Sequence, residues 1–518
     1  MKVLWRAMQQ DRVLAVGTLC ATILFTVPFL VTKILPFLDL PNHTLLSLAV
    51  SDILRDEHLA GASYYLQPYV VPYWCYYALS AVTTSTLGVF LGAKVAVWLT
   101  LLLLPLSMMR LCLATGRDPK IGLLGFALTW DFNAYYGFLT FRLGIAMMLF
   151  FLAAFLGAKS VRQTLLGSWR VAVMALSHSY AFGLYGLSLF PLLFLEPISR
   201  RRLQRFLSLF AVVLFVLAAL LFGRESTKIS MRPKIMGFSG PGERLAAFYQ
   251  WTVGTIQVQP EQTLQLIAFA CVLLLIVAMP IVAWRQRTRI SVAPHARARG
   301  LLLWTGLMFV LYLAMPPSLY WPRDVWALLY PRQATLTLLL AVLIARATWV
   351  GRAKVLFLIL VCVSVVCIHV AVIHQFLSFA PLARDFVAVV DGIPQDTAVL
   401  GLFYDFSHPA VSHKLAVNQF AAYAAAVAHG YSSQAFDEQE IIVRHRRSAR
   451  RPKPGWDIQA SFRMEQHARH YDVIITRCEP HPLPEGMMGD GRELRLVKSV
   501  GEWKRYEASP ILWRRVRD

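Results

Sequence analysis

Apolar runs of about twenty residues recur along most of this chain, and they limit its fold more than any other feature. A helix of that length crosses the roughly 30 Å hydrocarbon core of a bilayer. Of the 518 residues, 57% are hydrophobic and only 15% are charged, whereas soluble domains are nearer to one half apolar and one quarter charged. The sequence therefore predicts a polytopic membrane protein.

The apolar runs separate a membrane domain from a polar tail. We predict an all-α polytopic domain of about 11 transmembrane helices, within a range of about 10 to 13, over residues 1–378. Residues 379–518 are predicted to form a small extracytoplasmic α/β domain. Their length, about 140 residues, is ordinary for a domain. Residues 171–197 fit either two spans or one long or broken helix. The predicted spans are 13–35, 92–112, 121–137, 140–158, 171–182, 183–197, 204–223, 263–284, 300–317, 328–349 and 353–378.

Basic residues give the orientation of these spans. The net charge of +22 would also suit a nucleic-acid partner, but the arginines lie in short loops such as "SRRRLQR" (199–205) and "RQRTR" (285–289). With a cytoplasmic N-terminus and an external C-terminus, every strongly basic short loop falls on the cytoplasmic side. The charge thus indicates contact with membrane lipid and no nucleic acid. The first apolar run is too long for a signal-peptide core and should remain uncleaved.

Two long external loops are predicted, at 36–91 and 224–262. Within the first, "YYLQPYVVPYWCYYALSAVTTST" (64–86) is apolar enough to be counted as a span. Counting it would place the basic residues at 110–120 outside. Its aromatic and proline residues instead favour a helix at the membrane interface.

The polar tail has the pattern of a small α/β domain. Three strand-like runs, "TAVLGLFYD" (397–405), "YDVIITR" (471–477) and "EWKRYEA" (502–508), flank "NQFAAYAAAVAHG" (418–430). The last of these predicts a helix that a glycine ends.

Asp39 lies just outside the first predicted span, in "PFLDLPNHTLL" (36–46). The segment "LPNHTLLSLAVSDIL" that follows predicts an amphipathic helix, which Asp39 or Asn42 could cap. A positioned carboxylate could also accept a proton in a reaction. His43 lies one helical turn further on and could share a face with Asp39, although such residues are more often plain interfacial histidines.

In its architecture the whole chain resembles the GT-C superfamily of membrane glycosyltransferases, which includes oligosaccharyltransferase catalytic subunits and protein O-mannosyltransferases. The shared features are the acidic residue that opens a long external loop with interfacial helices, the many spans, and an external C-terminal domain. The motif "DLPNH" differs from the Asp-Glu pair of the mannosyltransferases. The resemblance implies transfer of a sugar from a polyprenyl-phosphate-linked donor to a glycan, lipid or protein acceptor on the extracytoplasmic side. The excess of arginine over lysine and the compact tail suggest a bacterial inner membrane. Asp39 would be the catalytic base, and His43 would tune it or bind the acceptor.

A second motif, "WDFNAYYGF" (130–138), follows the third predicted span on the external side. Asp131 and Asn133 stand where oligosaccharyltransferases carry an Asp-x-Asp that helps to bind a divalent metal, Mg or Mn. This chain has Asp-x-Asn, and an Asn oxygen can still bind a hard cation. The alternative is that both residues cap or hydrogen bond at a helix end.

The implied leaving group is a polyprenyl phosphate or diphosphate, so cations should gather on the external face. The candidates are Arg142, Arg232, Lys234 and Arg332. Arg332 in "LYPRQ" is favoured because it begins a span at the interface and because a guanidinium binds phosphate through two parallel hydrogen bonds. Its alternative partner is Asp324. His178 in "ALSHSYAFGL" is an intramembrane candidate, or else a hydrogen-bonding residue between helices.

Two other functions compete with the transferase. One is a transporter or flippase of lipid-linked glycans, and the other is a non-catalytic subunit of a surface-polysaccharide assembly system. Transporters usually show paired halves with broken helices in corresponding positions. We find no such internal symmetry in the sequence.

The predicted topology can be tested with reporter fusions at residues 290 and 440. Because the basic loops fix the orientation, we expect the first fusion to report the cytoplasmic side and the second the external side. Two fusions that report the same side would show that the span count is wrong.

Overall fold

The computed structural model describes most of the chain, and the structural statements below concern only the described residues. These are 2–55, 63–67, 72–195, 199–222, 234–236, 239–256, 258–285, 293–320, 325–344, 352–409, 411, 416–432, 434–435, 442–446, 462–481, 483, 486–488 and 492–510.

The chain packs as two compact units, each built from three segments. The first unit comprises Met1–Pro28, Tyr69–Tyr76 and Val97–Gln375, and the second comprises Phe29–Pro68, Tyr77–Ala96 and Phe376–Asp518. The boundary near residue 375 falls inside one long helix, α18. The domain division predicted at 378 lies close to it and stays a prediction.

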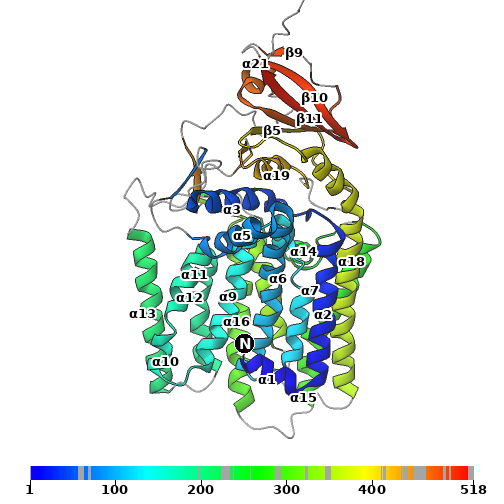
Figure 1. Ribbon diagram of the computed structural model, residues 1–518. Coiled ribbons are helices and arrows are strands. Elements are labelled where there is room, and N and C mark those ends of the chain that lie inside the picture. Colours follow the sequence, from blue (N-terminus) through cyan, green and yellow to red (C-terminus); the bar gives the residue numbers. More distant parts are fainter. Residues whose placement is uncertain are drawn as a thin grey trace, which may run out of the picture. The chain divides into compact units, whose positions relative to one another are not determined.

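Helices dominate the part of the chain that precedes residue 391 (Figure 1). In chain order they are α1 (Lys2–Gln10), α2 (Arg12–Val31), α3 (Leu40–Leu54), α5 (Trp74–Leu87), α6 (Val89–Ala114), η1 (Pro119–Leu123), α7 (Leu124–Ala127), α8 (Phe132–Tyr136), α9 (Leu139–Gly157), α10 (Val161–Leu166), α11 (Trp169–Ser177), α12 (Ser179–Leu192), η2 (Leu193–Leu195), α13 (Arg200–Phe222), α14 (Pro241–Thr252), α15 (Glu261–Arg285), α16 (Ala293–Ala314), α17 (Leu329–Val342) and α18 (Arg352–Val390). A three-stranded antiparallel sheet joins β2 (Lys234–Met236), β3 (Ser318–Tyr320) and β4 (Val325–Ala327).

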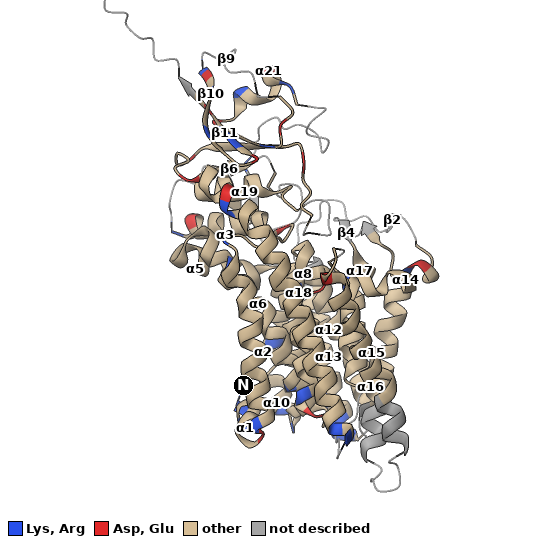
Figure 2. Cartoon of the chain, turned by 90° about the vertical axis from the view of Figure 1, so that its right-hand side faces the viewer, with Lys and Arg blue, Asp and Glu red and all other residues tan. Residues whose placement is uncertain are grey.

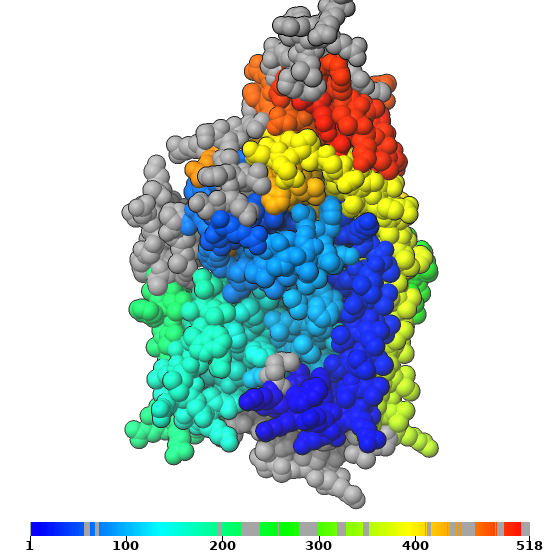
Figure 3. All heavy atoms as spheres, in the orientation of Figure 1, coloured from blue at the N-terminus to red at the C-terminus, as the bar shows by residue number. Residues whose placement is uncertain are grey.

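Several helices have the length and surface of membrane spans. In the described part of the chain five are long and apolar enough, namely Arg12–Val31, Val89–Ala114, Leu139–Gly157, Glu261–Ala278 and Arg352–Val390. Large apolar side chains are exposed on them, for example Val16, Leu19 and Ile23 on α2, which is dark blue in Figure 3. Figure 2 shows few charged residues along the middle of the long helices. Such surfaces are solvated by lipid tails, so the protein is an integral membrane protein. The predicted count of about 11 spans stays a prediction.

At two places where the sequence predicts spans, the structure has no continuous helix. Residues 121–137 fold as η1, α7 and α8, because Asp131 adopts an extended backbone (φ −98°, ψ 176°) and Gly137 ends α8 in the left-handed region (φ 86°). The prediction of one span there is therefore wrong. Within 171–197 the helix breaks at His178, whose backbone is extended (φ −168°, ψ 127°) between α11 and α12. The broken-helix alternative is thus the one observed.

The second unit contains α3 and a six-stranded mixed sheet. The strand order is β6-β5-β8-β11-β10-β9, with β5 parallel to both β6 and β8 and the remaining pairs antiparallel. The predicted helix at 418–430 and the three predicted strands are all present, as α19, β5, β8 and β11. The bounds are β1 (Tyr64–Leu66), β5 (Ala398–Phe403), α19 (Phe420–Val427), β6 (Tyr431–Ser432), β7 (Val443–His445), α21 (Met464–His467), η5 (Ala468–His470), β8 (Val473–Arg477), β9 (Gly486–Met488), β10 (Arg492–Val500) and β11 (Trp503–Pro510).

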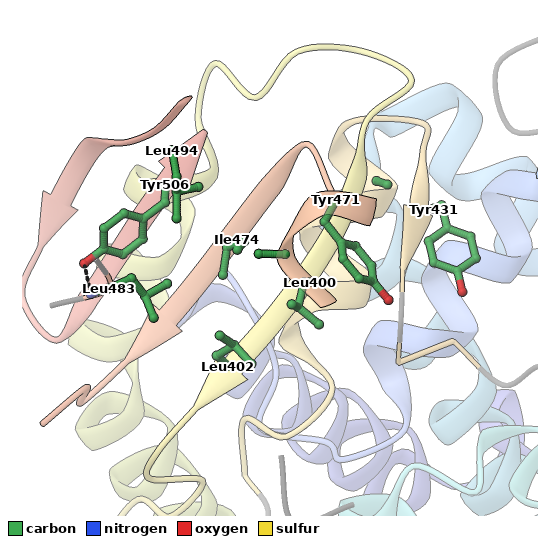
Figure 4. Close-up of a cluster of buried hydrophobic side chains, with 10 residues drawn as sticks. Leu400, Leu402, Tyr431, Tyr471, Ile474, Leu483, Leu494 and Tyr506 are labelled. Carbon is green, nitrogen blue, oxygen red and sulfur yellow. Dashed lines mark hydrogen bonds between the residues drawn. The ribbon is translucent and has the colours of Figure 1, made fainter. Parts of the chain in front are cut away.

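Both faces of this sheet are packed. On one face Figure 4 shows a cluster of buried side chains that includes Leu400, Ile474 and Tyr506. On the other face Trp503 is fully buried and lies parallel to Phe420 of α19, with ring centroids 5.9 Å apart. Phe386 of α18 packs on the same indole at 4.9 Å. Trp503 therefore anchors α19 and the end of α18 to the sheet.

Trp503→Ala should destabilise the protein by about 3–5 kcal/mol, because it leaves a cavity among the rings of Phe386, Phe403 and Phe420. The measurement is the thermal unfolding midpoint of the purified protein in detergent. The control is Leu496→Ala on β10, since Leu496 is 38% exposed and its truncation should change the midpoint little. Equal shifts for both variants would contradict the anchoring role.

Candidate functional site

The candidate residues form one cluster in the second unit and two in the first. In the second unit Asp39 occupies the N-cap position of α3, but its side chain makes no capping hydrogen bond. Its Oδ1 instead accepts a hydrogen bond of 2.8 Å from Nε2 of Gln419. The Asp39 side chain is therefore directed to a residue of the C-terminal segment and not to the start of its own helix.

Gln419 also binds a second residue of α3. Its Oε1 accepts a hydrogen bond of 2.5 Å from Nδ2 of Asn42. Asn42 is fully buried, whereas Asp39 and Gln419 are partly buried. The helix α3 itself is buried along almost its whole length, although the sequence predicted an amphipathic helix. The three polar side chains thus form a connected group at the start of α3.

Two further contacts hold α3 in place. The ring Nδ1 of His43 lies 2.9 Å from the hydroxyl of Tyr77 on α5. Near the other end of α3, Oδ2 of the buried Asp52 lies 2.9 Å from Nδ1 of His429, directly after α19. The predicted role of His43, in tuning Asp39 or binding an acceptor, stays a prediction.

The first unit contains a buried ion pair at the second predicted motif. Asp131 is fully buried, and its Oδ2 lies 3.0 Å from Nη1 of Arg142, which is 2% exposed. The same oxygen accepts a hydrogen bond from the Thr335 hydroxyl and one of 2.8 Å from Asn133 Nδ2. Its Oδ1 accepts from the backbone N–H of Ala134 at 3.0 Å. These contacts join α8, α9 and α17.

This arrangement does not fit the divalent metal that the Asp-x-Asn motif suggested. A hard cation needs several oxygen ligands directed at it, whereas both carboxylate oxygens of Asp131 already accept hydrogen bonds. The Arg142 guanidinium supplies the positive charge beside them. Among the described residues, no group of three or more His, Cys, Asp or Glu side chains could hold a metal ion. The alternative reading of this motif, hydrogen bonding at a helix end, is the one observed, since Asp131 caps α8.

Arg332 lies in the first turn of α17 and faces two aromatic rings and a histidine. Its guanidinium carbon is 3.9 Å from the ring centroid of Phe138 and 5.5 Å from that of Phe141. Its Nη1 is 3.4 Å from Nε2 of His178, which is buried. The structure therefore brings together the favoured phosphate candidate and the intramembrane histidine, two residues 154 positions apart in the chain.

The protonation of His178 follows from its other contact. Nδ1 accepts a hydrogen bond of 3.1 Å from the backbone N–H of Tyr180, so in the neutral ring the proton resides on Nε2. That Nε2–H faces the N–H groups of Arg332, which has no acceptor atom. Two donors thus point at a common region, and an anion placed there would accept from both.

The remaining phosphate candidates are less defined. Arg142 forms an ion pair with Asp131. Arg232 lies outside the described residues, and Lys234 is described only as the first residue of β2. Asp324, the alternative partner of Arg332, also lies outside them. Sequence reasoning missed Gln419 and Thr335, because neither belongs to a motif and each acts through a partner more than 200 positions away.

Comparisons with known proteins were made for the sequence and for the structure. No protein-family model and no curated protein matches the sequence. The structure is similar to the cryo-EM structure of arabinofuranosyltransferase AftD from Mycobacteria, with 14% identity and a TM-score of 0.46, over 96% of this chain and 40% of that one. It is also similar to the crystal structure of the apo oligosaccharyltransferase from Archaeoglobus fulgidus, with 11% identity and a TM-score of 0.42, over 90% of this chain and 69% of that one.

Both matched proteins are GT-C glycosyltransferases, the superfamily that the sequence resembles. This chain spans about two fifths of the length of the arabinofuranosyltransferase. With TM-scores below 0.5, the two likenesses assign no activity, donor or residue role to this chain.

The buried ion pair between Asp131 and Arg142 should stabilise the first unit. Asp131→Asn or Arg142→Met alone leaves one buried charge without its counterion, which should cost about 3–5 kcal/mol. The double variant should cost less than the sum of the two. Thermal unfolding of the purified variants in detergent measures these costs.

The control is the pair Arg384–Asp385, at 3.8 Å, in which the Arg384 side chain is 72% exposed, so that Arg384→Met should change stability by less than about 1 kcal/mol. Strictly additive costs at Asp131 and Arg142 would contradict a coupled pair.

Proposed function

We propose that this protein is a membrane glycosyltransferase that transfers a sugar from a polyprenyl-phosphate-linked donor to an acceptor on the extracytoplasmic side. The observation that carries the proposal is the pair of donors formed by Arg332 and the His178 Nε2–H, 3.4 Å apart beside Phe138. A phosphate oxygen accepts from a guanidinium and an imidazole N–H together. In the low-dielectric surroundings of the Phe138 and Phe141 rings, such hydrogen bonds are electrostatically stronger than in water.

In the proposed reaction the acceptor oxygen or nitrogen attacks the anomeric carbon of the donor sugar. The bond from that carbon to the phosphate oxygen breaks, and the polyprenyl phosphate leaves as an anion. Arg332 and His178 donate hydrogen bonds to its phosphate, which stabilises the charge that develops. By the resemblance to the GT-C superfamily, the Asp39 carboxylate takes up the acceptor's proton. No step of this proposal requires a metal ion, because the Asp131 group does not fit one.

The proposal also includes the membrane in which the protein lies and the orientation of its termini. The basic loops favour a cytoplasmic N-terminus and an external C-terminus, and the excess of arginine over lysine with the compact tail favours a bacterial inner membrane. The acceptor is a glycan, a lipid or a protein that presents a hydroxyl or amide group.

A lipid-phosphate transporter or flippase is the second candidate, and one observation favours it. The break between α11 and α12 places His178 at a discontinuity, and transporters often bind anions at the broken ends of helices. A variant of Asp39 distinguishes the two functions, because the transferase needs a proton acceptor at this position and a transporter does not.

Arg332→Ala should weaken binding of a lipid-linked donor by about ten- to a hundredfold, the value of a charge-assisted hydrogen bond. Arg332→Lys should restore only part of the affinity, because lysine lacks the planar fork. The dissociation constant is measured by titrating the purified protein in nanodiscs with a polyprenyl-phosphate sugar.

Arg110→Ala is the matched control for this experiment. Arg110 also stacks on a phenylalanine, with its guanidinium carbon 4.2 Å from the Phe150 ring centroid, but it lies near the predicted cytoplasmic end of its span. Its loss should leave the dissociation constant unchanged. An unchanged constant for Arg332→Ala would rule out the phosphate role.

Asp39→Asn should abolish sugar transfer while donor affinity and the unfolding midpoint stay near the wild-type values. The amide keeps the size of the side chain and an oxygen that can accept from Gln419, but it does not take up a proton. Transfer is measured with a labelled donor and membranes that contain the acceptor. Full activity of this variant would remove the base role and favour the transporter.

A further inference from the structure

Gln419 is the one side chain of the C-terminal segment with a described hydrogen bond to the Asp39 carboxylate. Its Nε2 donates a hydrogen bond to Asp39 Oδ1 at 2.8 Å, and its Oε1 accepts one from Asn42 Nδ2 at 2.5 Å. The Asp39 carboxylate fixes which way the amide faces, because it only accepts hydrogen bonds and an exchanged amide would turn the Gln419 oxygen toward it. The N–H of Gln419 is therefore directed at the carboxylate.

The backbone around Gln419 is held by the sheet. The next residue, Phe420, is fully buried against Trp503 of β11. Upstream, the N–H of Val417 donates to the carbonyl of Phe406 at 3.3 Å. That loop is held in turn by Nη1 of Arg477, at the end of β8, which donates to the carbonyl oxygens of Asp405 at 2.5 Å and Ser407 at 2.9 Å.

A carboxylate needs such a support if it is to act as a base. The terminal torsion of an aspartate is broad and has no sharp staggered minimum, so the direction of its lone pairs depends on its partners. A catalytic base acts only when it lies within hydrogen-bond reach of the proton that it removes. A small error of position can lower the rate by about a hundredfold.

We propose that Gln419 is a positioning residue that fixes the plane of the Asp39 carboxylate for proton removal from the acceptor. This role rests on the proposed function, because it assigns to the C-terminal segment a part in that same reaction. The C-terminal segment would therefore set the catalytic rate, through one amide, without touching the reacting atoms.

The test is a comparison of kcat with KM for Gln419→Leu and Gln419→Glu. Leucine has a similar size and no hydrogen bond, and glutamate keeps the oxygen that accepts from Asn42 but places a second carboxylate beside Asp39. We expect kcat to fall by about ten- to a hundredfold in both variants. The KM for donor and acceptor should stay near the wild-type values. Gln419→Leu also leaves the buried Asn42 amide without its acceptor, which should lower the unfolding midpoint, so kcat is measured per folded molecule. A purely structural role would lower the midpoint and leave that kcat unchanged.

The matched control is Gln395→Leu in the same unit. Gln395 is exposed and donates to the carbonyl of Val427, at the end of α19, at 3.3 Å, so its loss should leave kcat unchanged. If Gln419→Leu does not fold, the kcat and KM of Gln419→Glu decide between a positioning role and a purely structural role.

The outcomes separate this inference from the proposed function. An inactive Asp39→Asn together with a fully active Gln419→Leu overturns the positioning role alone. A fully active Asp39→Asn overturns the base role and, with it, the positioning role. A low kcat per folded molecule in Asp39→Asn and in Gln419→Leu, with unchanged KM, supports both.

Discussion

The hydrogen bond between Gln419 and Asp39 joins two segments 380 positions apart in the chain, and the geometry around Asp39 depends on it. Burial of α3 brings its polar residues out of water, and a buried polar group must find a partner inside the protein. Gln419 supplies partners for Asp39 and Asn42, while His429 supplies one for Asp52. Apolar packing thus brings the segments together, and these polar contacts fix their register.

The first unit shows two ways of placing an arginine among apolar helices. Arg142 meets Asp131, and that carboxylate also accepts hydrogen bonds from Asn133 and Thr335, so the two charges of the group cancel. Arg332 lies over the ring of Phe138, and its Nη1 is 3.4 Å from Nε2 of His178, so two hydrogen-bond donors lie close together. The first arrangement suits a structural role, and the second suits an anionic ligand.

Local patterns predicted much of the fold. The helix Leu40–Leu54 and the elements β5, β8, β11 and α19 follow from periodicity and from glycine as a stop signal, which act over a few residues. The predicted span at 121–137 was wrong because apolar composition does not reveal that Asp131 leaves the helical conformation to cap α8. The Asp-x-Asn motif could not reveal Arg142, which folds back onto Asp131 from the following helix. Gln419 had no local signal, since its partners are set by long-range packing.

The measurement that tests this account most directly is a cryo-EM structure of the protein in nanodiscs with a polyprenyl phosphonate sugar, a donor analogue that cannot be cleaved. We expect the phosphonate oxygens to lie within hydrogen-bond distance of the Arg332 guanidinium and of His178 Nε2. An analogue bound elsewhere, with the contact between Arg332 and His178 unchanged, would contradict it.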